Sequence, residues 1–187
     1  MKNALILHGT ANTSAGNWFP WLGAQLQAKG FTVWCPDLPG ADHPDLDRYA
    51  AAILSNTTWQ FTEDSIIVGH SSGGTAGLKL LQRLPKETVI HACFTVSSSF
   101  VKHGADPIEG LMREDFQFDV IKEHAKHFVV FHSDDDPYVP IADAHILSER
   151  LSGELIVIRG QGHFNLEKGP QYRQFPKLLE TILAYTP

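Results

Sequence analysis

The sequence predicts an α/β fold, with a mostly parallel sheet of about six strands and helices on both faces. Two observations support this. Short, almost continuously apolar runs of four or five residues recur along the chain, as expected for parallel strands covered on both faces. Longer amphipathic stretches separate these runs, and strands that alternate with helices indicate βαβ units with right-handed crossovers.

The apolar runs expected to form strands are residues 4–7, 31–35, 65–68, 92–96, 128–131 and 155–158. The amphipathic segments expected to form helices are residues 18–29, 45–55, 72–84, 115–127, 141–151 and 172–185. Gly30 follows the first of these segments as a helix stop, and Pro44 and Pro140 stand near helix starts. Residues 97–126 leave room for a loop and one helix only, so we expect no inserted cap domain.

Length and composition favour a single globular domain over residues 1–187. The formal net charge is −6 and no basic stripe is present, so nucleic acid is not an expected partner. No apolar run approaches the ~18 residues of a membrane span, and no signal peptide precedes the first apolar run. We therefore expect a cytoplasmic protein without a membrane partner, in which Cys35 and Cys93 are buried thiols.

The segment Gly69-His70-Ser71-Ser72-Gly73 has the Gly-x-Ser-x-Gly pattern of a nucleophile elbow. A predicted strand leads into it and a helix-like segment leaves it, which is the context that the motif requires. Ser71 at the apex is the candidate nucleophile. Ser72 is a weaker candidate because it lacks glycines at both positions two residues away. His70 is expected to point away from the Ser71 hydroxyl and to pack or form hydrogen bonds.

A serine nucleophile needs a general base that a third group orients, and the order expected on this fold is Ser, Asp or Glu, then His. His163 lies in Gly160-Gln161-Gly162-His163-Phe164, directly after the last predicted strand, and is the candidate base. The acid should follow the preceding strand, where three aspartates are adjacent. Asp136 is preferred because it opens a turn closed by two prolines, and Asp134 is the alternative.

The aspartate run lacks the alternating spacing and the glycine of a calcium loop, so neither a metal nor another cofactor is expected. The backbone N–H groups of Ser72 and Thr10 are the predicted oxyanion donors, since Thr10 follows the first strand in His8-Gly9-Thr10. Trp18, Phe116 and Phe164 are candidate side chains of the substrate pocket. For Trp18, a place in the core under the first helix is an equally good interpretation.

With these motifs in place, the chain resembles the small serine hydrolases related to human retinoblastoma-binding protein 9. The resemblance covers nearly the whole chain and rests on residues 69–74 (Gly-His-Ser-Ser-Gly-Gly), 135–140 (Asp-Asp-Pro-Tyr-Val-Pro) and 162–165 (Gly-His-Phe-Asn). Residues 116–118 with 121–122 are similar to an aromatic patch of that family. The resemblance implies a single-domain α/β-hydrolase fold, a Ser71–His163–Asp136 triad and esterase-like activity.

The expected function is therefore carboxylesterase-like hydrolysis of small-molecule esters through an acyl-enzyme. The same triad is compatible with a thioesterase, an amidase or an acyltransferase. A third hypothesis is a non-catalytic protein-binding module on a hydrolase fold, which leaves a protein partner open. Without a cap the site should be open, and short or accessible acyl groups should be preferred.

Overall fold

The structure, a computed structural model, describes residues 1–186 and contains a six-stranded sheet in which all neighbouring strands are parallel. The strand order is β2-β1-β3-β4-β5-β6. The strands are β1 (Asn3–Leu7), β2 (Thr32–Trp34), β3 (Ser65–His70), β4 (Ile90–Val96), β5 (Ala125–His132) and β6 (Glu154–Val157). The predicted fold class is confirmed, and every predicted strand is present within a few residues of its expected bounds.

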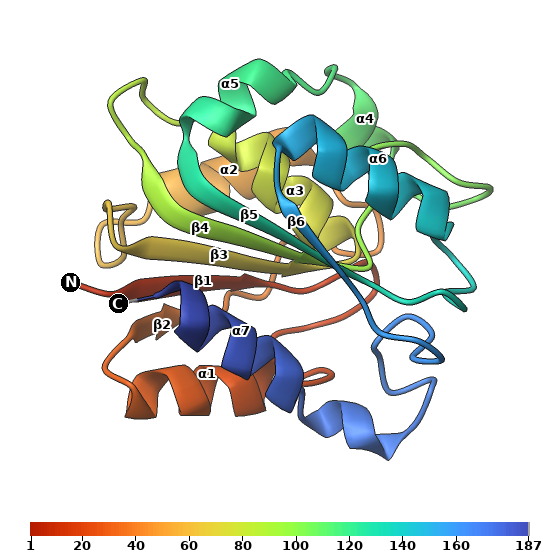
Figure 1. Cartoon of the computed structure of the whole chain (residues 1–187). Coiled ribbons are helices and arrows are strands. Elements are labelled where there is room, and N and C mark those ends of the chain that lie inside the picture. Colours follow the sequence, from red (N-terminus) through yellow and green to blue (C-terminus); the bar gives the residue numbers. More distant parts are fainter. Residues whose placement is uncertain (187) are drawn as a thin grey trace.

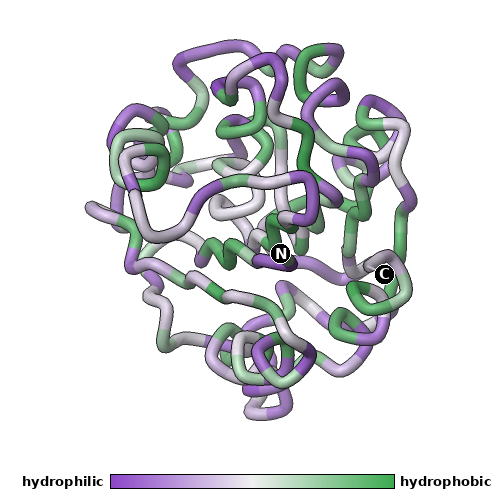
Figure 2. The backbone as a smooth tube through the Cα atoms, turned by 90° about the vertical axis from the view of Figure 1, so that its left-hand side faces the viewer, coloured by the Kyte–Doolittle hydropathy of each residue, from purple (hydrophilic) through white to green (hydrophobic). Residues whose placement is uncertain are grey.

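Helices cover both faces of the sheet, as Figure 1 shows. One face carries α2 (Leu46–Leu54), α3 (Ser72–Leu81), α4 (Glu109–Met112), α5 (Phe118–Glu123) and α6 (Ile141–Leu151). The other face carries α1 (Phe19–Ala28) and α7 (Pro176–Tyr185), the latter preceded by the 3-10 helix η1 (Pro170–Arg173). Hydrophilic stretches run mainly along the outer loops (Figure 2).

Alternation along the strands divides the apolar side chains between two cores. In β1, Leu5 and Leu7 pack on the α3 side, whereas Ala4 and Ile6 pack on the α1 side. All four side chains are fully buried, as the almost continuous apolar run of this strand predicted. Every residue of α3 is buried as well, so the helix that begins after Ser71 lies in the centre of the molecule.

Two predicted helices differ from the structure. Residues 115–127 were expected to be one helix, but α5 ends at Glu123 and β5 begins at Ala125, because this strand pairs with β4 from Ala125 onward. The expected helix over residues 172–185 is broken before Pro176, which has no N–H to donate and is favoured in the first turn of a helix. Phe175, the residue before this proline, is not helical.

The segment between β4 and β5 contains two short helices, α4 and α5, where room for only one was expected, and no inserted domain within residues 1–186. Of the two cysteines, Cys93 is buried as predicted and Cys35 is half-buried. Burial raises the pKa of both thiols to about 12. Across the described residues, no helix combines the length and the apolar character that crossing a membrane would require.

The sheet order places a topological switch between β1 and β3. The chain runs from β1 outward to β2, then returns to the other side of β1 to form β3. In open α/β sheets, ligands bind outside the carboxyl ends of the strands at such a switch. The loops that follow β1 and β3 contain Thr10 and Ser71, so the fold brings two predicted site segments to the expected place.

Candidate active site

Ser71 lies at a strained turn between β3 and α3. Its backbone has φ 54° and ψ −128°, a conformation that a residue with a side chain rarely adopts and that costs about 1–3 kcal/mol. The turn is held by hydrogen bonds from the Ser71 N–H to Val96 O (2.8 Å) and from the Gly74 N–H to Ser71 O (3.0 Å). This geometry is the one that the Gly-x-Ser-x-Gly pattern predicts for a nucleophile elbow.

The flanking glycines are required by close backbone contacts. A Cβ atom on Gly69 would lie 2.3 Å from the Cα of Gly74. A Cβ atom on Gly73 would lie 2.4 Å from the carbonyl oxygens of both Leu7 and His8. Because the obstacles are backbone atoms, no side-chain rearrangement would relieve these clashes, and both positions demand glycine.

His163 and Asp136, predicted from separate loops, meet in the structure. His163 Nδ1 lies 2.9 Å from Asp136 Oδ2 and 3.1 Å from Oδ1. The Asp136 side chain is fully buried, and it also accepts the N–H groups of Tyr138 (2.9 Å) and Val139 (3.1 Å). The acid therefore has a fixed orientation, and it orients the imidazole in turn.

The charge of Asp136 is stabilised despite its burial. Burial alone would raise the pKa of this carboxyl, but the hydrogen bond and charge of His163 and the N–H of Tyr138 outweigh that effect and lower it. The His132 ring, whose Nε2–H donates to Val139 O (2.9 Å), lies 3.9 Å from Asp136 Oδ2. Burial lowers the pKa of His132, so this ring is a neutral neighbour at pH 7.

The other two aspartates of the run hold the loop that carries His163, residues 160–164, here called the base loop. Asp134 Oδ1 accepts the Gly160 N–H (2.9 Å), and Asp135 Oδ1 accepts the Gly162 N–H (2.6 Å). Asp134 makes no hydrogen bond to His163 in the part of the chain that the structure describes. The geometry therefore favours Asp136 over Asp134 as the partner of His163, and it gives each carboxylate of the run a contact with the base loop.

The loop after β1 is joined to the elbow. Thr10 Oγ1 donates to Ser72 Oγ (2.9 Å), and a Cβ atom on Gly9 would lie 3.0 Å from the Ser71 Cβ. The His8 Nδ1–H donates to Gly9 O (2.9 Å) and its Nε2 accepts the Leu38 N–H (2.9 Å), so this ring fixes the start of the loop. Burial lowers the pKa of His8, which agrees with a neutral ring.

Ser71, His163 and Thr10 line one cleft, with a volume of about 800 Å³. No direct hydrogen bond joins the Ser71 hydroxyl to His163 within residues 1–186. In sites without substrate this bond is often long, and it tightens when the substrate binds.

One wall of the cleft comes from residues 99–106, a segment that the sequence did not mark as functional. Ser99, His103 and Asp106 from this segment line the cleft. The Asp143 carboxylate in the first turn of α6 accepts hydrogen bonds from Ser99 Oγ (2.7 Å) and lies 2.6 Å from His103 Nε2. These contacts join residues about 40 positions apart, so no local pattern could have revealed them.

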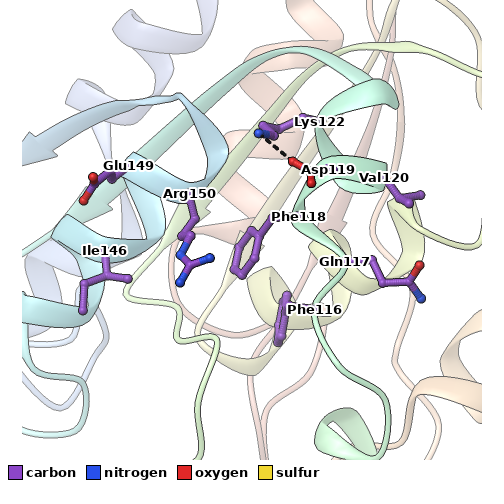
Figure 3. A pocket seen from close by; sticks show the side chains of 9 residues that line it. All are labelled: Phe116, Gln117, Phe118, Asp119, Val120, Lys122, Ile146, Glu149 and Arg150. Atoms are coloured by element: carbon purple, nitrogen blue, oxygen red, sulfur yellow. Dashed lines mark ion pairs between the residues drawn. The ribbon is translucent and has the colours of Figure 1, made fainter.

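The structure does not place the three predicted pocket residues in this cleft, which corrects that expectation. Trp18 and Phe164 are fully buried in the core under α1 and α7, where the Trp18 Nε1–H donates to Phe164 O (3.1 Å). Phe116 stacks on Phe118 (ring centroids 5.5 Å apart) and lines a different cavity, of about 970 Å³. Figure 3 shows this second cavity, where the Arg150 side chain points toward the Phe118 ring, with its guanidinium carbon 5.9 Å from the ring centroid.

The comparisons with known proteins agree with the fold. The family described as serine hydrolase matches residues 4–183. The chain belongs to this family. The putative hydrolase YdeN of Bacillus subtilis is 27% identical over 98% of this chain and 96% of YdeN. The serine hydrolase RBBP9 of Rattus norvegicus is 25% identical over 95% of this chain and 92% of its own.

Solved structures show the same architecture. The crystal structure of the YdeN product superposes with a TM-score of 0.90 at 26% identity, over 99% of this chain and 98% of that chain. Est1E from Butyrivibrio proteoclasticus, solved with ferulic acid bound, superposes with a TM-score of 0.75 at 14% identity, over 99% of this chain and 88% of its own. At that identity the likeness concerns the fold alone.

Proposed function

We propose that the chain is a carboxylesterase-like serine hydrolase with Ser71 as nucleophile, His163 as general base and Asp136 as the orienting acid. The observation that carries the proposal is the His163–Asp136 pair (2.9 Å), in which His163 lines the same cleft as a serine on a strained elbow. Membership of the serine hydrolase family supports hydrolysis in general. The ester substrate and the triad are our proposal.

The hydrogen bond to Asp136 assigns a role to each nitrogen of His163. Nδ1 carries a hydrogen and donates it to the carboxylate, so Nε2 is free to take the proton of the Ser71 hydroxyl. The Ser71 oxygen then attacks the ester carbonyl, and the C–O bond to the alcohol breaks as His163 returns the proton to that alcohol. Water hydrolyses the acyl-enzyme by the same route and releases the carboxylic acid.

The backbone N–H groups of Ser72 and Thr10 are the proposed oxyanion donors. Ser72 is the first residue of α3, whose amino-terminal N–H groups and partial positive charge favour a developing anion. Thr10 lines the cleft, and its side chain is hydrogen-bonded to Ser72. Loss of one such donor typically costs about 2.7–4 kcal/mol of transition-state stabilisation.

The substrate that we propose is a small-molecule ester with a short or accessible acyl group. The cleft has no inserted domain over it among the described residues, and its volume of about 800 Å³ suits a small ligand. The proposed reaction uses no cofactor.

Labelling with a fluorophosphonate probe tests the nucleophile. The wild type should become labelled and hydrolyse p-nitrophenyl esters, and Ser71→Ala should lose both activities. Ser72→Ala should still be labelled, although more slowly, because Thr10 loses its hydrogen-bond partner while the backbone N–H of residue 72 remains. Labelling of Ser71→Ala at the wild-type rate would disprove the assignment.

A matched panel of substrates tests the reaction class. The panel contains esters of increasing chain length, the corresponding thioesters and aminopeptide amides. We expect esters to be hydrolysed faster than thioesters, and thioesters faster than amides. Among the esters, those with the shortest chains should react fastest. A higher kcat/KM for thioesters or amides would replace the esterase proposal with another reaction of the same triad. Absence of Ser71-dependent turnover on every class would favour a binding module.

A further inference from the structure

We propose that His70 is a positioning residue that holds the backbone of the base loop, and hence His163, in register with Ser71. The inference rests on the proposed function, since it concerns how nucleophile and base are kept in place. His70 is the last residue of β3, directly before Ser71, and its Nε2 lies 2.8 Å from the carbonyl oxygen of His163. One side chain thus joins the strand of the nucleophile to the loop of the base.

The hydrogen bond also determines the tautomer of the ring. A carbonyl oxygen can only accept, so Nε2 of His70 carries the hydrogen. Its Nδ1 is buried and has no hydrogen-bond partner among the described residues, as expected for the nitrogen without a hydrogen. Burial, and then the positive charge of a nearby His163, lower the pKa of His70 to about 3, so the ring stays neutral over the working range of an esterase.

The ring is packed tightly enough to act as a rigid link. His70 is 3% exposed, and its ring makes edge contacts with Trp18 (centroids 6.0 Å apart) and with the His163 ring (4.9 Å). The ring of Phe19, in α1, packs against the His70 ring with the two centroids 5.9 Å apart. A buried imidazole between these rings has little freedom to move. Its Nε2 hydrogen bond therefore keeps the base loop at a fixed position relative to β3.

The base loop needs such support because its backbone is unusual. Gly160, Gly162 and Phe164 all have positive φ angles, and Phe164 has a side chain that disfavours this region. The acid loop, residues 133–140, accepts hydrogen bonds from the N–H groups of Gly160 and Gly162. His70 is the described side chain that links this loop directly to β3, the strand that leads into Ser71.

The expected consequence of losing the link is a fall in kcat. If the base loop shifts by about 1 Å relative to Ser71, the rate can fall about 100-fold, because proton transfer depends on the distance between Ser71 Oγ and His163 Nε2. His70 lies at the edge of the cleft but is only 3% exposed, so its replacement should change few substrate contacts and KM should stay nearly constant. A residue that only filled core volume would not separate kcat from KM in this way.

Three variants test the proposal on the intact chain. His70→Phe keeps an aromatic ring but removes the donor, whereas His70→Gln places an amide N–H near the position of Nε2. His91→Phe is the matched control: the Nε2 of His91 lies 2.6 Å from the Tyr185 carbonyl oxygen, and neither residue lines the cleft. Each variant is assayed for kcat and KM on a short p-nitrophenyl ester, for the rate of Ser71 labelling and for thermal unfolding.

We expect His70→Phe to lower kcat and the labelling rate about 10- to 100-fold with KM within about twofold, and His70→Gln to recover most of the loss. His91→Phe should lower the melting temperature but keep kcat. Wild-type kcat in His70→Phe, or equal losses in His70→Phe and His70→Gln, would overturn the positioning role. These failures leave Ser71-dependent hydrolysis intact, whereas failure of the proposed function would appear as wild-type turnover in Ser71→Ala.

Discussion

Two regions border the same cleft and are held in place by different means. On the catalytic side, the elbow, the acid loop and the base loop are joined by buried hydrogen bonds and by backbone conformations that only certain residues tolerate. In the other region, residues 99–106, Ser99 and His103 contact Asp143, and the His103 side chain is 32% exposed. The proposed reacting groups are thus held by buried contacts, while the wall proposed to meet the substrate has a contact that is partly exposed to solvent.

This difference predicts that substitutions on the two sides will affect different kinetic constants. Changes on the catalytic side should lower kcat, because they displace or mis-orient the reacting groups. Changes in the cleft wall should act mainly on KM and on the choice of substrate. Three predictions probe the two regions, in decreasing order of expected effect.

The largest effect is expected from Asp136→Asn. The amide cannot stabilise the charged imidazole and favours the wrong tautomer of His163, so kcat should fall about 10³- to 10⁴-fold. Asp134→Asn is the matched control in the same run, since its amide oxygen can still accept the Gly160 N–H. Steady-state kinetics on a short ester would measure both variants. Equal losses in the two would contradict the assignment of Asp136.

An intermediate effect is expected on stability in acid, through the buried neutral ring of His70. Its pKa is about 3 in the folded state and about 6.5 in the unfolded chain, so below pH 6.5 the unfolded state binds the extra proton. The ring's contribution to stability is therefore complete above pH 6.5 and is lost as pH falls toward 3. Between these two pKa values, the unfolding free energy should fall by up to about 1.4 kcal/mol for each unit by which the pH is lowered.

Chemical denaturation between pH 7 and pH 4.5 would measure this slope. His70→Gln cannot take up the proton, so its unfolding free energy should depend less steeply on pH than that of the wild type. His8 and His132 also have lowered pKa values because of burial, so part of the slope should remain. An unchanged slope in His70→Gln would show that His70 is not the neutral buried group inferred from its contacts.

The smallest effect is expected from His103→Ala in the cleft wall. A partly exposed pair such as His103–Asp143 contributes at most about 1 kcal/mol, so KM should change by no more than about fivefold. The rate of Ser71 labelling by a small fluorophosphonate should stay close to that of the wild type. Lys102→Gln, which removes an exposed ion pair with Glu109 in the same region, is the control. A large fall in kcat would show that the wall also positions the reacting groups.

The parts of the site that follow from local sequence were predictable. Ser71 stands in a motif whose glycines are required by contacts within the same turn and with β1, and the strand and helix around it have clear patterns. His163 and Asp136 could be proposed because the order of strands indicates which loops meet at the carboxyl edge of a parallel sheet. Their hydrogen bond agrees with that reasoning.

The parts that depend on packing were not predictable. Trp18 and Phe164 stand beside site loops in the sequence, but their side chains point into the core between the sheet and α1. The boundary between α5 and β5 was misplaced because the pairing of Ala125 with Ile90 overrides the helical pattern of that segment. In each case a contact between distant segments outweighed a local preference.

The residue pattern alone is sufficient to derive the parallel α/β sheet, the elbow at Ser71 and the pairing of the loops with Asp136 and His163. Each of these depends on local geometry or on the order of the strands. The periodicity of apolar residues and the positions of turn residues indicate both. Only the tertiary structure reveals the hydrogen bond from His70 to the base loop and the contact of the cleft wall with Asp143. These contacts join residues 93 and 40 positions apart, and their existence depends on the packing of the whole sheet with its helices.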